Sequence, residues 1–375
     1  MEFIPTRAAG LARLESFTPK MGRIYAAGRN TDPGPLGRHD VSALSPWLRR
    51  RLLTEPDVIA VAQQTHAEAS YKFVSEVAWR TYFKGWLEQH PSVWTAYLHD
   101  LQRDENRLAS ESGLRQVFHD ACAGATGIDC FDEWATSLVQ HGWLHNHSRM
   151  WFASIWIFTL RLPWTLGAAF FMRHLLDGDP ASNTLSWRWV AGLHTRGKHY
   201  VARADNIDRY TDGRHNPRGQ LDETPQPLEE DVNHPRVPLT ASDPMPAGAF
   251  ALLLHDDDLH PESLPLDLSR ASAIAITTTV RGAEPRVAFV EGAIADTIAR
   301  LGRPIHRLAP PDVADWVASQ HQPVVTPWAP IGETASLLRD LPLARLRRPW
   351  DSTIWPHATR GFFQVRQRLP ELLLA

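Results

Sequence analysis

The chain has 375 residues, enough for two domains, and its 43% hydrophobic and 22% charged content is ordinary for a soluble globular protein. A formal net charge of −3 argues against a protein that coats nucleic acid by bulk electrostatics. Residues 1–217 carry 24 Lys and Arg against 22 Asp and Glu, and residues 218–375 carry 15 against 20, so we expect any nucleic-acid contact to use a local patch on the first part. Two cysteines exclude a disulfide framework and no apolar N-terminal segment marks a secretory signal, so a cytoplasmic protein is expected.

Residues 1–40 are rich in turn signals, and a helix is expected to begin near residue 46. Ser42 and Ser45 could cap that helix, and the free N–H groups of a helix N-terminus suit a phosphate group. An ordinary N-cap explains the same pattern without a ligand. The arginine run at 49–51 follows, and we expect its side chains to face either DNA phosphates or water.

Residues 68–98 are expected to form one helix, because apolar side chains recur there at three- and four-residue spacing. Glu76, Trp79, Arg80 and Phe83 follow at i, i+3, i+4 and i+7, so they share one side of that helix. A carboxylate beside an indole and a guanidinium on a largely buried face suggests a binding site. The alternative is an intrahelical ion pair beside a core tryptophan.

The stretch from residue 145 to residue 189 has polar residues at both ends of an apolar segment. Arg161, Pro163 and Arg173 interrupt the apolar segment before about 18 clean residues accumulate, so we expect two buried helices joined near Pro163 and no membrane span. The turn at 177–179 presents two carboxylates around a glycine, and Arg149 is a natural counter-charge. Buried helices bracketed by converging charges predict a ligand pocket.

Residues 218–247 are rich in Pro, Asp and Glu without periodicity, which predicts a linker. Beyond them, short apolar runs at 249–255, 273–280 and 323–330 and a helix over 286–302 predict a small α/β domain with a parallel sheet. This part has no GxGxxG or Walker loop. The last segment, 359–373, could pack onto either domain.

No rival catalytic set is apparent. His141, His145 and His147 lack the spacing of a zinc site, no HExxH or GxSxG is present, and we expect no metal. Eleven of the fifteen tryptophans precede residue 200, and for most of them core filling is the simplest explanation.

Four sequence motifs follow one another along the chain: E-x-x-W-R at 76–80, H-N-x-x-R-M at 145–150, D-G-D-x-x-x-N at 177–183 and W-x-W at 187–189. Together they resemble the FAD-binding domain of the DNA photolyase/cryptochrome family. Segment 41–48 is similar to a flavin-contacting segment of that family, with Val41 in place of a threonine. The resemblance implies FAD as cofactor. The residues that it implies for FAD contacts are Tyr25, Arg29, Ser42, Ala43, Leu44, Ser45, Arg80, Arg149, Asp177, Gly178, Asp179 and Asn183.

The resemblance also implies light-driven repair of cyclobutane pyrimidine dimers in DNA, by electron transfer from excited reduced flavin. A dimer must leave the duplex to reach such a donor, and aromatic faces with a few hydrogen-bonding groups suit it there. The residues implied at the lesion are Glu76, Trp79, Asn146, Met150 and Trp189. Asn146 and Met150 favour the cyclobutane-dimer class within the family.

Flavin photoreduction in this family uses a chain of tryptophans. Trp187 and Trp164 match the proximal and middle positions, whereas Glu111 stands at the distal one and cannot serve as a donor. Trp143, Trp151 or Trp156 could replace it by another route, or the chain is incomplete.

We therefore predict a mostly α protein: a helical photolyase-type FAD-binding domain over 1–217, a Pro-rich linker over 218–247 and a small C-terminal α/β Rossmann-like domain over 248–375. The last part weakly resembles a permuted antenna domain, and an antenna chromophore stays unassigned. DNA containing pyrimidine dimers is the expected partner. Val41 and His147, the latter where many repairing members carry arginine, keep open a cryptochrome-like blue-light or redox sensor. A flavin-holding remnant that binds a partner is the third reading.

Overall fold

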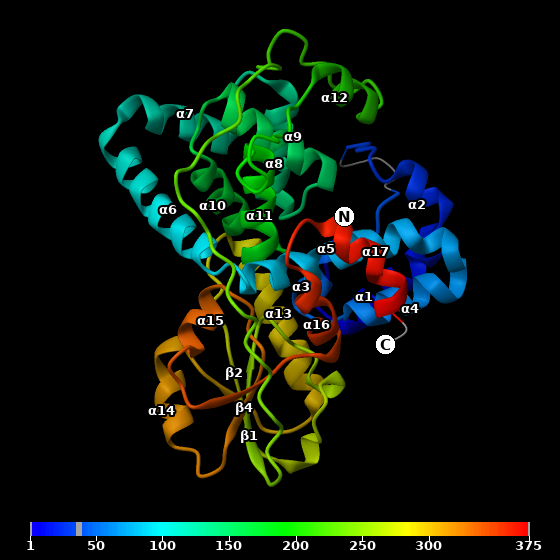
Figure 1. Cartoon of the computed structure of the whole chain (residues 1–375), viewed down its shortest axis with the longest axis vertical. Coiled ribbons are helices and arrows are strands. Elements are labelled where there is room, and N and C mark those ends of the chain that lie inside the picture. Colours follow the sequence, from blue (N-terminus) through cyan, green and yellow to red (C-terminus); the bar gives the residue numbers. More distant parts are fainter. Residues whose placement is uncertain (1, 35–39, 374–375) are drawn as a thin grey trace.

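The computed structural model describes residues 2–34 and 40–373. Helices build the first part of the chain and a parallel sheet follows residue 249 (Figure 1). The helices of the first part are α1 (Arg7–Phe17), α2 (Arg23–Gly28), α3 (Ser45–Arg49), α4 (Glu55–His66), α5 (Tyr71–Glu88), α6 (Ser92–Ser110), α7 (Ser112–Ala123), α8 (Asp129–His141), α9 (Asn146–Ser154), α10 (Trp164–His174), α11 (Pro180–Ala191) and α12 (Ala204–Tyr210). Every helix that the structure describes is too short or too polar to cross a lipid bilayer.

Two helix expectations have different outcomes. A single helix over 68–98 is wrong, because α5 ends at Glu88 and α6 begins at Ser92. Pro91 explains the break, since the residue before a proline is pushed away from helical backbone angles. The expected break near Pro163 is confirmed: α9 continues as a π-helix over Ile155–Thr159, and Pro163 precedes α10.

The second part is an α/β unit with five parallel strands in the order β3-β2-β1-β4-β5. The strands are β1 (Phe250–His255), β2 (Ala271–Thr277), β3 (His306–Arg307), β4 (Val324–Pro327) and β5 (Leu343–Leu346). The helices are α13 (Glu284–Leu301), α14 (Val313–Ala318), α15 (Glu333–Leu338), α16 (Pro349–Ile354) and α17 (Phe362–Leu372). The predicted fold class, a helical region plus a small parallel α/β region, is confirmed.

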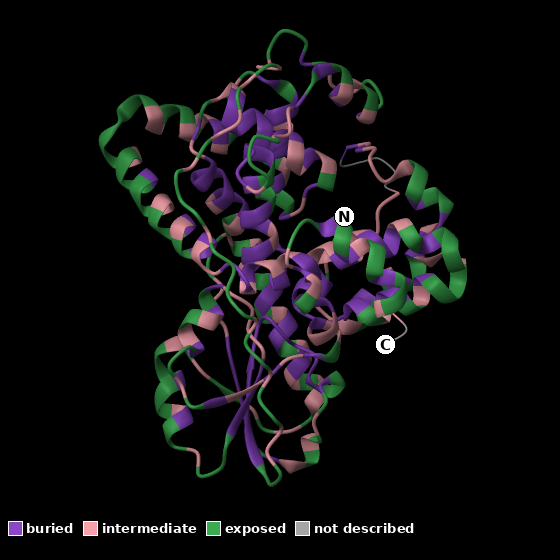
Figure 2. Cartoon of the chain, viewed as in Figure 1, coloured by how far each residue is buried: buried purple, intermediate pink, exposed green. Residues whose placement is uncertain are grey.

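Strand β1 is buried along its whole length because both faces of the sheet are covered (Figure 2). Phe250, Leu252 and Leu254 join one hydrophobic cluster, whereas Ala251 and Leu253 join another with residues of α14 and α15. This alternation follows from the two-residue period of a strand. The first cluster also contains side chains of α1, α4 and α13, so the N-terminal helices and the sheet share one core. The predicted domain limits stay a prediction.

The arginine run at 49–51 joins the two parts. All three side chains are buried, so the expectation that they face DNA or water is wrong. Their partners are mainly the three aspartates that follow β1: Arg49 pairs with Asp257 at 2.5 Å, Arg50 with Asp256 at 2.5 Å and Arg51 with Asp258 at 3.8 Å. Arg51 also pairs with Asp351 of α16 at 2.5 Å, and Arg348 makes a two-point contact with Asp258. Buried charges need partners of opposite charge, which explains why a run of three arginines faces a run of three aspartates.

Candidate functional site

The Asp-Gly-Asp turn between α10 and α11 is the centre of the predicted site. Asp179 precedes α11 and caps it, since its carboxylate accepts a hydrogen bond from the backbone N–H of Ser182 at 2.7 Å. The carbonyl of Gly178 accepts a hydrogen bond from Arg49 at 2.9 Å. Both carboxylates are buried, so each depends on cations brought by other helices.

The carboxylate of Asp177 lies near side chains from other predicted segments of the site. Its carboxylate lies 3.1 Å from Arg149 of α9 and 3.9 Å from Arg80 of α5, and the side chain of Ser45 also lowers its pKa. Burial would raise the pKa of Asp177, but the two guanidiniums hold it below its usual value. The structure therefore brings Ser45, Arg80, Arg149 and Asp177 together, as a common ligand site requires.

Asp179 has two cationic neighbours that sequence reasoning did not assign to the site. Arg49 lies 3.5 Å away and Lys84 of α5 lies 3.8 Å away, and both are buried. Burial raises and these cations lower the pKa of Asp179, with a net fall to about 2. Lys84 stands four residues after Arg80, so its place on the same helix side was a usable signal.

Several buried polar atoms around the turn have no hydrogen-bond partner among the described residues. They are Asp177 Oδ1, Arg80 Nη1, Lys84 Nζ and Ser182 Oγ. Buried polar groups are normally hydrogen-bonded, so a set left without partners at one turn fits a polar ligand. A flavin with its ribityl and pyrophosphate groups offers both donors and acceptors to such atoms, and the residues present fit FAD.

Tyr25, Arg29 and residues 42–45 differ in detail from expectation. Tyr25 is buried with its ring edge-on to Phe73 at 5.0 Å, and Arg29 lies 4.0 Å from Glu76. The N-cap of α3 is Leu44, with no side-chain cap bond, so capping by Ser42 or Ser45 is wrong. Ser42 instead accepts a hydrogen bond from the backbone of Leu44 at 3.4 Å, and Ala43 takes a positive φ of 52°.

The residues expected at the lesion are partly accessible. Glu76 is paired with Lys72 at 3.0 Å, and Trp79 is half-buried. Asn146, at the start of α9, is exposed, Met150 is half-buried, and Trp189 is 37% exposed with its ring stacked on Tyr200. Their roles stay predictions. Asn183 is buried, and its amide N–H donates to the carbonyl of Ala168 at 2.8 Å.

The tryptophans expected to carry electrons are buried but not arranged as one obvious stack. Trp187 lies edge-on to Phe171 at 5.1 Å and to Trp156 at 6.2 Å, and its indole N–H has no partner among the described residues. Trp164 lies 5.5 Å from Tyr97. Glu111 is exposed and paired with Arg107, as befits a surface residue. Of the three substitutes for the distal donor, Trp156 is the one in ring contact with Trp187.

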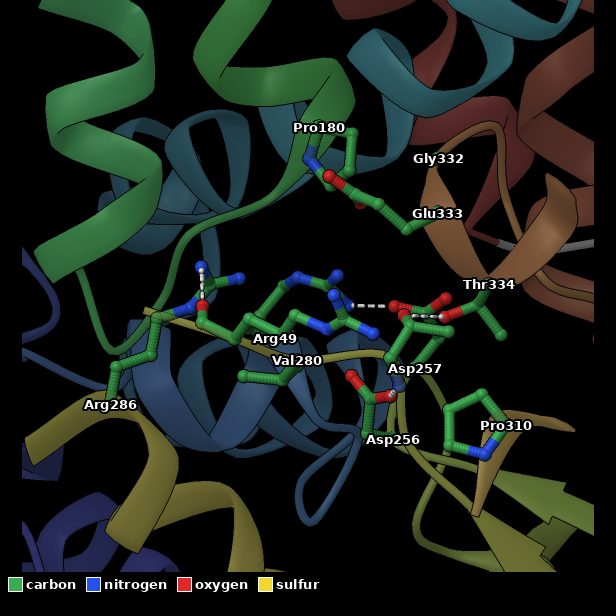
Figure 3. A pocket seen from close by; sticks show the side chains of 12 residues that line it. Arg49, Pro180, Asp256, Asp257, Val280, Arg286, Pro310, Gly332, Glu333 and Thr334 are labelled. Carbon is green, nitrogen blue, oxygen red and sulfur yellow. Dashed lines mark hydrogen bonds and ion pairs between the residues drawn. The ribbon is translucent and has the colours of Figure 1, made fainter. Parts of the chain in front are cut away.

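A cavity of about 330 Å3 lies at the carboxyl ends of β1, β2 and β4, where the strand order changes direction. Figure 3 shows the guanidinium of Arg49 directed at Asp257 in this cavity. Among the described residues of the helical part, Arg49 and Pro180 line it, and none of the predicted lesion residues does. The structure gives no reason to assign a second chromophore to it.

Comparisons with known proteins place the predicted site in a family context. Residues 73–220 match the family model described as the FAD binding domain of DNA photolyase. Deoxyribodipyrimidine photo-lyase of Streptomyces griseus is 32% identical over 181 residues, which cover 44% of this chain and 38% of that protein. Cryptochrome DASH of Natronomonas pharaonis is 30% identical over 221 residues, which cover 57% of this chain and 43% of that protein. A solved class III photolyase of Agrobacterium tumefaciens is 25% identical with a TM-score of 0.45, over 55% of this chain and 43% of that one.

The matched segment contains the E-x-x-W-R, H-N-x-x-R-M, D-G-D-x-x-x-N and W-x-W blocks. It begins after Tyr25, Arg29 and residues 42–45, whose cofactor roles stay predictions. The chain spans about two fifths of the length of the curated relatives named above. The blocks stand in order, and cations from three helices hold the buried Asp-Gly-Asp turn. The segment over 73–220 is therefore similar to the FAD-binding domains of the photolyase/cryptochrome family.

Proposed function

We propose that this chain binds FAD and catalyses light-driven repair of cyclobutane pyrimidine dimers in DNA. The observation that carries the proposal is the Asp177 carboxylate, which is buried between Arg149 and Arg80 and keeps one oxygen without a partner among the described residues. A buried acceptor left without a partner serves a ligand better than it serves stability. The family of the segment that contains it supports FAD as that ligand.

The protein's own task in this reaction is to hold the cofactor and the extruded dimer together. When bound and reduced, FAD would supply on excitation the electron that splits the dimer and would receive it back. Asp177 and Asp179, neutralised by their cations, would hold the cofactor, and Trp79 and Trp189 would offer ring faces to the bases. Glu76 would accept hydrogen bonds from base N–H groups, exchanging its ion pair with Lys72 for them.

A sensor of cryptochrome type is the second candidate, and one observation favours it. His147 is engaged inside the protein, since its ring contacts the carbonyl of Asn30 at 2.9 Å and the hydroxyl of Tyr200 at 3.3 Å. Its ring also stacks on Trp151 at 4.0 Å. A residue held this way does not reach DNA phosphates. One relative carries the name cryptochrome DASH, which accords with this reading.

Repair of a defined thymine-dimer oligonucleotide by flavin-loaded, reduced protein under blue light tests the proposal. Glu76→Ala is the site variant, and Glu68→Ala is its control, because Glu68 is an exposed glutamate eight residues earlier in the chain. We expect repair that requires light, falls at least tenfold in Glu76→Ala and is unchanged in Glu68→Ala.

Each other result has a defined meaning. Flavin bound in stoichiometric amount without repair, after full reduction, would refute the repair function and favour the sensor. Absence of flavin binding in the reconstituted protein would refute both. Equal repair by the two glutamate variants would keep the activity and remove Glu76 from the lesion site.

A further inference from the structure

The C-terminal helix α17 lies along α5, the helix that carries Glu76 and Trp79. Two tyrosines of α5 fix its position: Tyr82 donates a hydrogen bond to the carbonyl of Arg360 at 2.8 Å, and Tyr71 donates one to the carbonyl of Arg366 at 3.0 Å. The chain therefore runs antiparallel to α5 past Trp79. This helix lies outside the segment matched by the family model.

One face of α17 is part of the protein core. Phe362, Val365 and Leu369 are buried at a spacing of three and four residues and pack against α5. Phe362 stacks on Trp79, with ring centroids 3.8 Å apart and an interplanar angle of 23°. Trp79 nevertheless stays half-exposed, so the surface that it offers to a ligand lies on the opposite ring face or the ring edge. Phe362 thereby fixes the plane of that ring.

Basic side chains flank the buried face of α17. Arg360, which precedes the helix, and Arg368 are exposed, and Arg366 is half-buried. Within residues 2–34 and 40–373 none of the three pairs with a carboxylate, and Arg368 donates a hydrogen bond to Nδ1 of His357 at 3.0 Å. Phe363 is 63% exposed, with the guanidinium of Arg366 over its ring at 4.7 Å. An exposed aromatic ring among guanidiniums that lack carboxylate partners, beside a ring proposed to stack on a base, is a surface that suits a nucleic acid.

We propose that α17 completes the DNA-binding face of this protein: Phe362 positions Trp79 for the flipped-out dimer, and Arg366 and Arg368 bind the phosphates beside it. The inference rests on the proposed function. Guanidiniums without acidic partners are free to replace the counterions of the DNA backbone. These arginines lie in residues 218–375, which carry a net negative charge, so the charge count of the sequence did not predict a basic surface there.

Two variants separate the two roles. Phe362→Leu keeps an apolar side chain in the core but removes the stacked ring, and we expect the ratio of affinities for dimer-containing and undamaged duplex to fall fivefold or more. Phe289→Leu, which removes a buried ring from α13 of the α/β unit, is the control for the loss of an aromatic ring. Because Phe362 is buried, thermal unfolding and flavin absorbance are measured in parallel to show that the protein is intact.

The double variant Arg366→Gln/Arg368→Gln tests the phosphate contacts without touching the core. We expect weaker binding to damaged and undamaged duplex alike, and a slope of log K against log salt smaller by about 2 than in the parent protein. Arg307→Gln/Arg339→Gln is the matched control, since it removes the same charge from exposed positions of the α/β unit.

The outcomes distinguish this inference from the function on which it rests. A parent protein that repairs dimers while the Phe362 and arginine variants retain its damage preference and salt slope would overturn the role of α17 alone. A higher damage preference in Phe362→Leu would show that this ring obstructs the site, which also overturns it. A parent protein that neither prefers damaged DNA nor repairs it would overturn both.

Discussion

The buried charges between α3 and β1 predict that Asp257→Asn destabilises the protein severely. Asp257 and Arg49 are both buried and lie 2.5 Å apart, and when Asp257 is neutral Arg49 loses this ion pair and keeps the longer one with Asp179 at 3.5 Å. Burial would raise the pKa of Asp257, yet Arg49 holds it well below its usual range, so the pair is ionised in the folded state. Removing one partner of a buried pair costs about 3–5 kcal/mol, because the other charge stays buried without compensation.

Urea unfolding followed by tryptophan fluorescence measures this cost, with Asp340→Asn, an exposed aspartate of the same unit, as the control expected to change the unfolding free energy by less than about 0.5 kcal/mol. The double variant Arg49→Gln/Asp257→Asn should cost less than the sum of the single variants by about 1–3 kcal/mol. An unfolding free energy of Asp257→Asn within about 1 kcal/mol of the parent, or strict additivity, would refute the reasoning.

Three further perturbations follow from other contacts. Burial raises the pKa of Glu88 to about 7 from 4.5, so the folded state retains a proton between these values, and stability should fall by roughly 1–3 kcal/mol as pH rises through that window. Melting temperatures from pH 4.5 to 8 check this, and Glu88→Gln should remove the slope. Trp164→Phe should slow flavin photoreduction under blue light, and a near-normal rate would exclude Trp164 from the electron path. Gly167→Ala would place its Cβ 2.3 Å from the ring of Trp187 and should cost about 1–3 kcal/mol in unfolding free energy, whereas Gly113→Ala meets no atom within 4 Å and should cost nothing.

Local signals predicted the elements with a clear period or motif. The two carboxylates around Gly178, the break at Pro163 and the central strands were readable because each depends on a few neighbouring residues. The edge strands β3 and β5 were not, because His306 and Arg307 are exposed and carry no strand pattern. The charge partners were missed for a different reason. A run of arginines indicates that anions are needed if it is buried, but it does not show that the aspartates that pair with it lie some 200 residues later in the chain.

Long-range contacts also decided what the candidate site contains. Trp79 was identified from its block, yet the ring that stacks on it, Phe362, lies more than 280 residues away and has no motif of its own. The apolar spacing of residues 362, 365 and 369 predicts an amphipathic helix but not the helix that it covers. Only the three-dimensional packing connects the C-terminal segment to the predicted lesion site.

The α/β unit has a direct bearing on the predicted flavin site, because Arg49 contacts both. Its guanidinium spans Asp179 of the flavin turn and Asp257 of the loop after β1, and its Nε–H donates to the carbonyl of Gly178 between the two aspartates of that turn. Without Asp257, Arg49 would lose its shortest ion pair and keep the longer one with Asp179, a carboxylate that it shares with Lys84. The geometry of the Asp-Gly-Asp turn therefore depends on a charge supplied by the sheet, and the α/β unit supports the cofactor site without lining it.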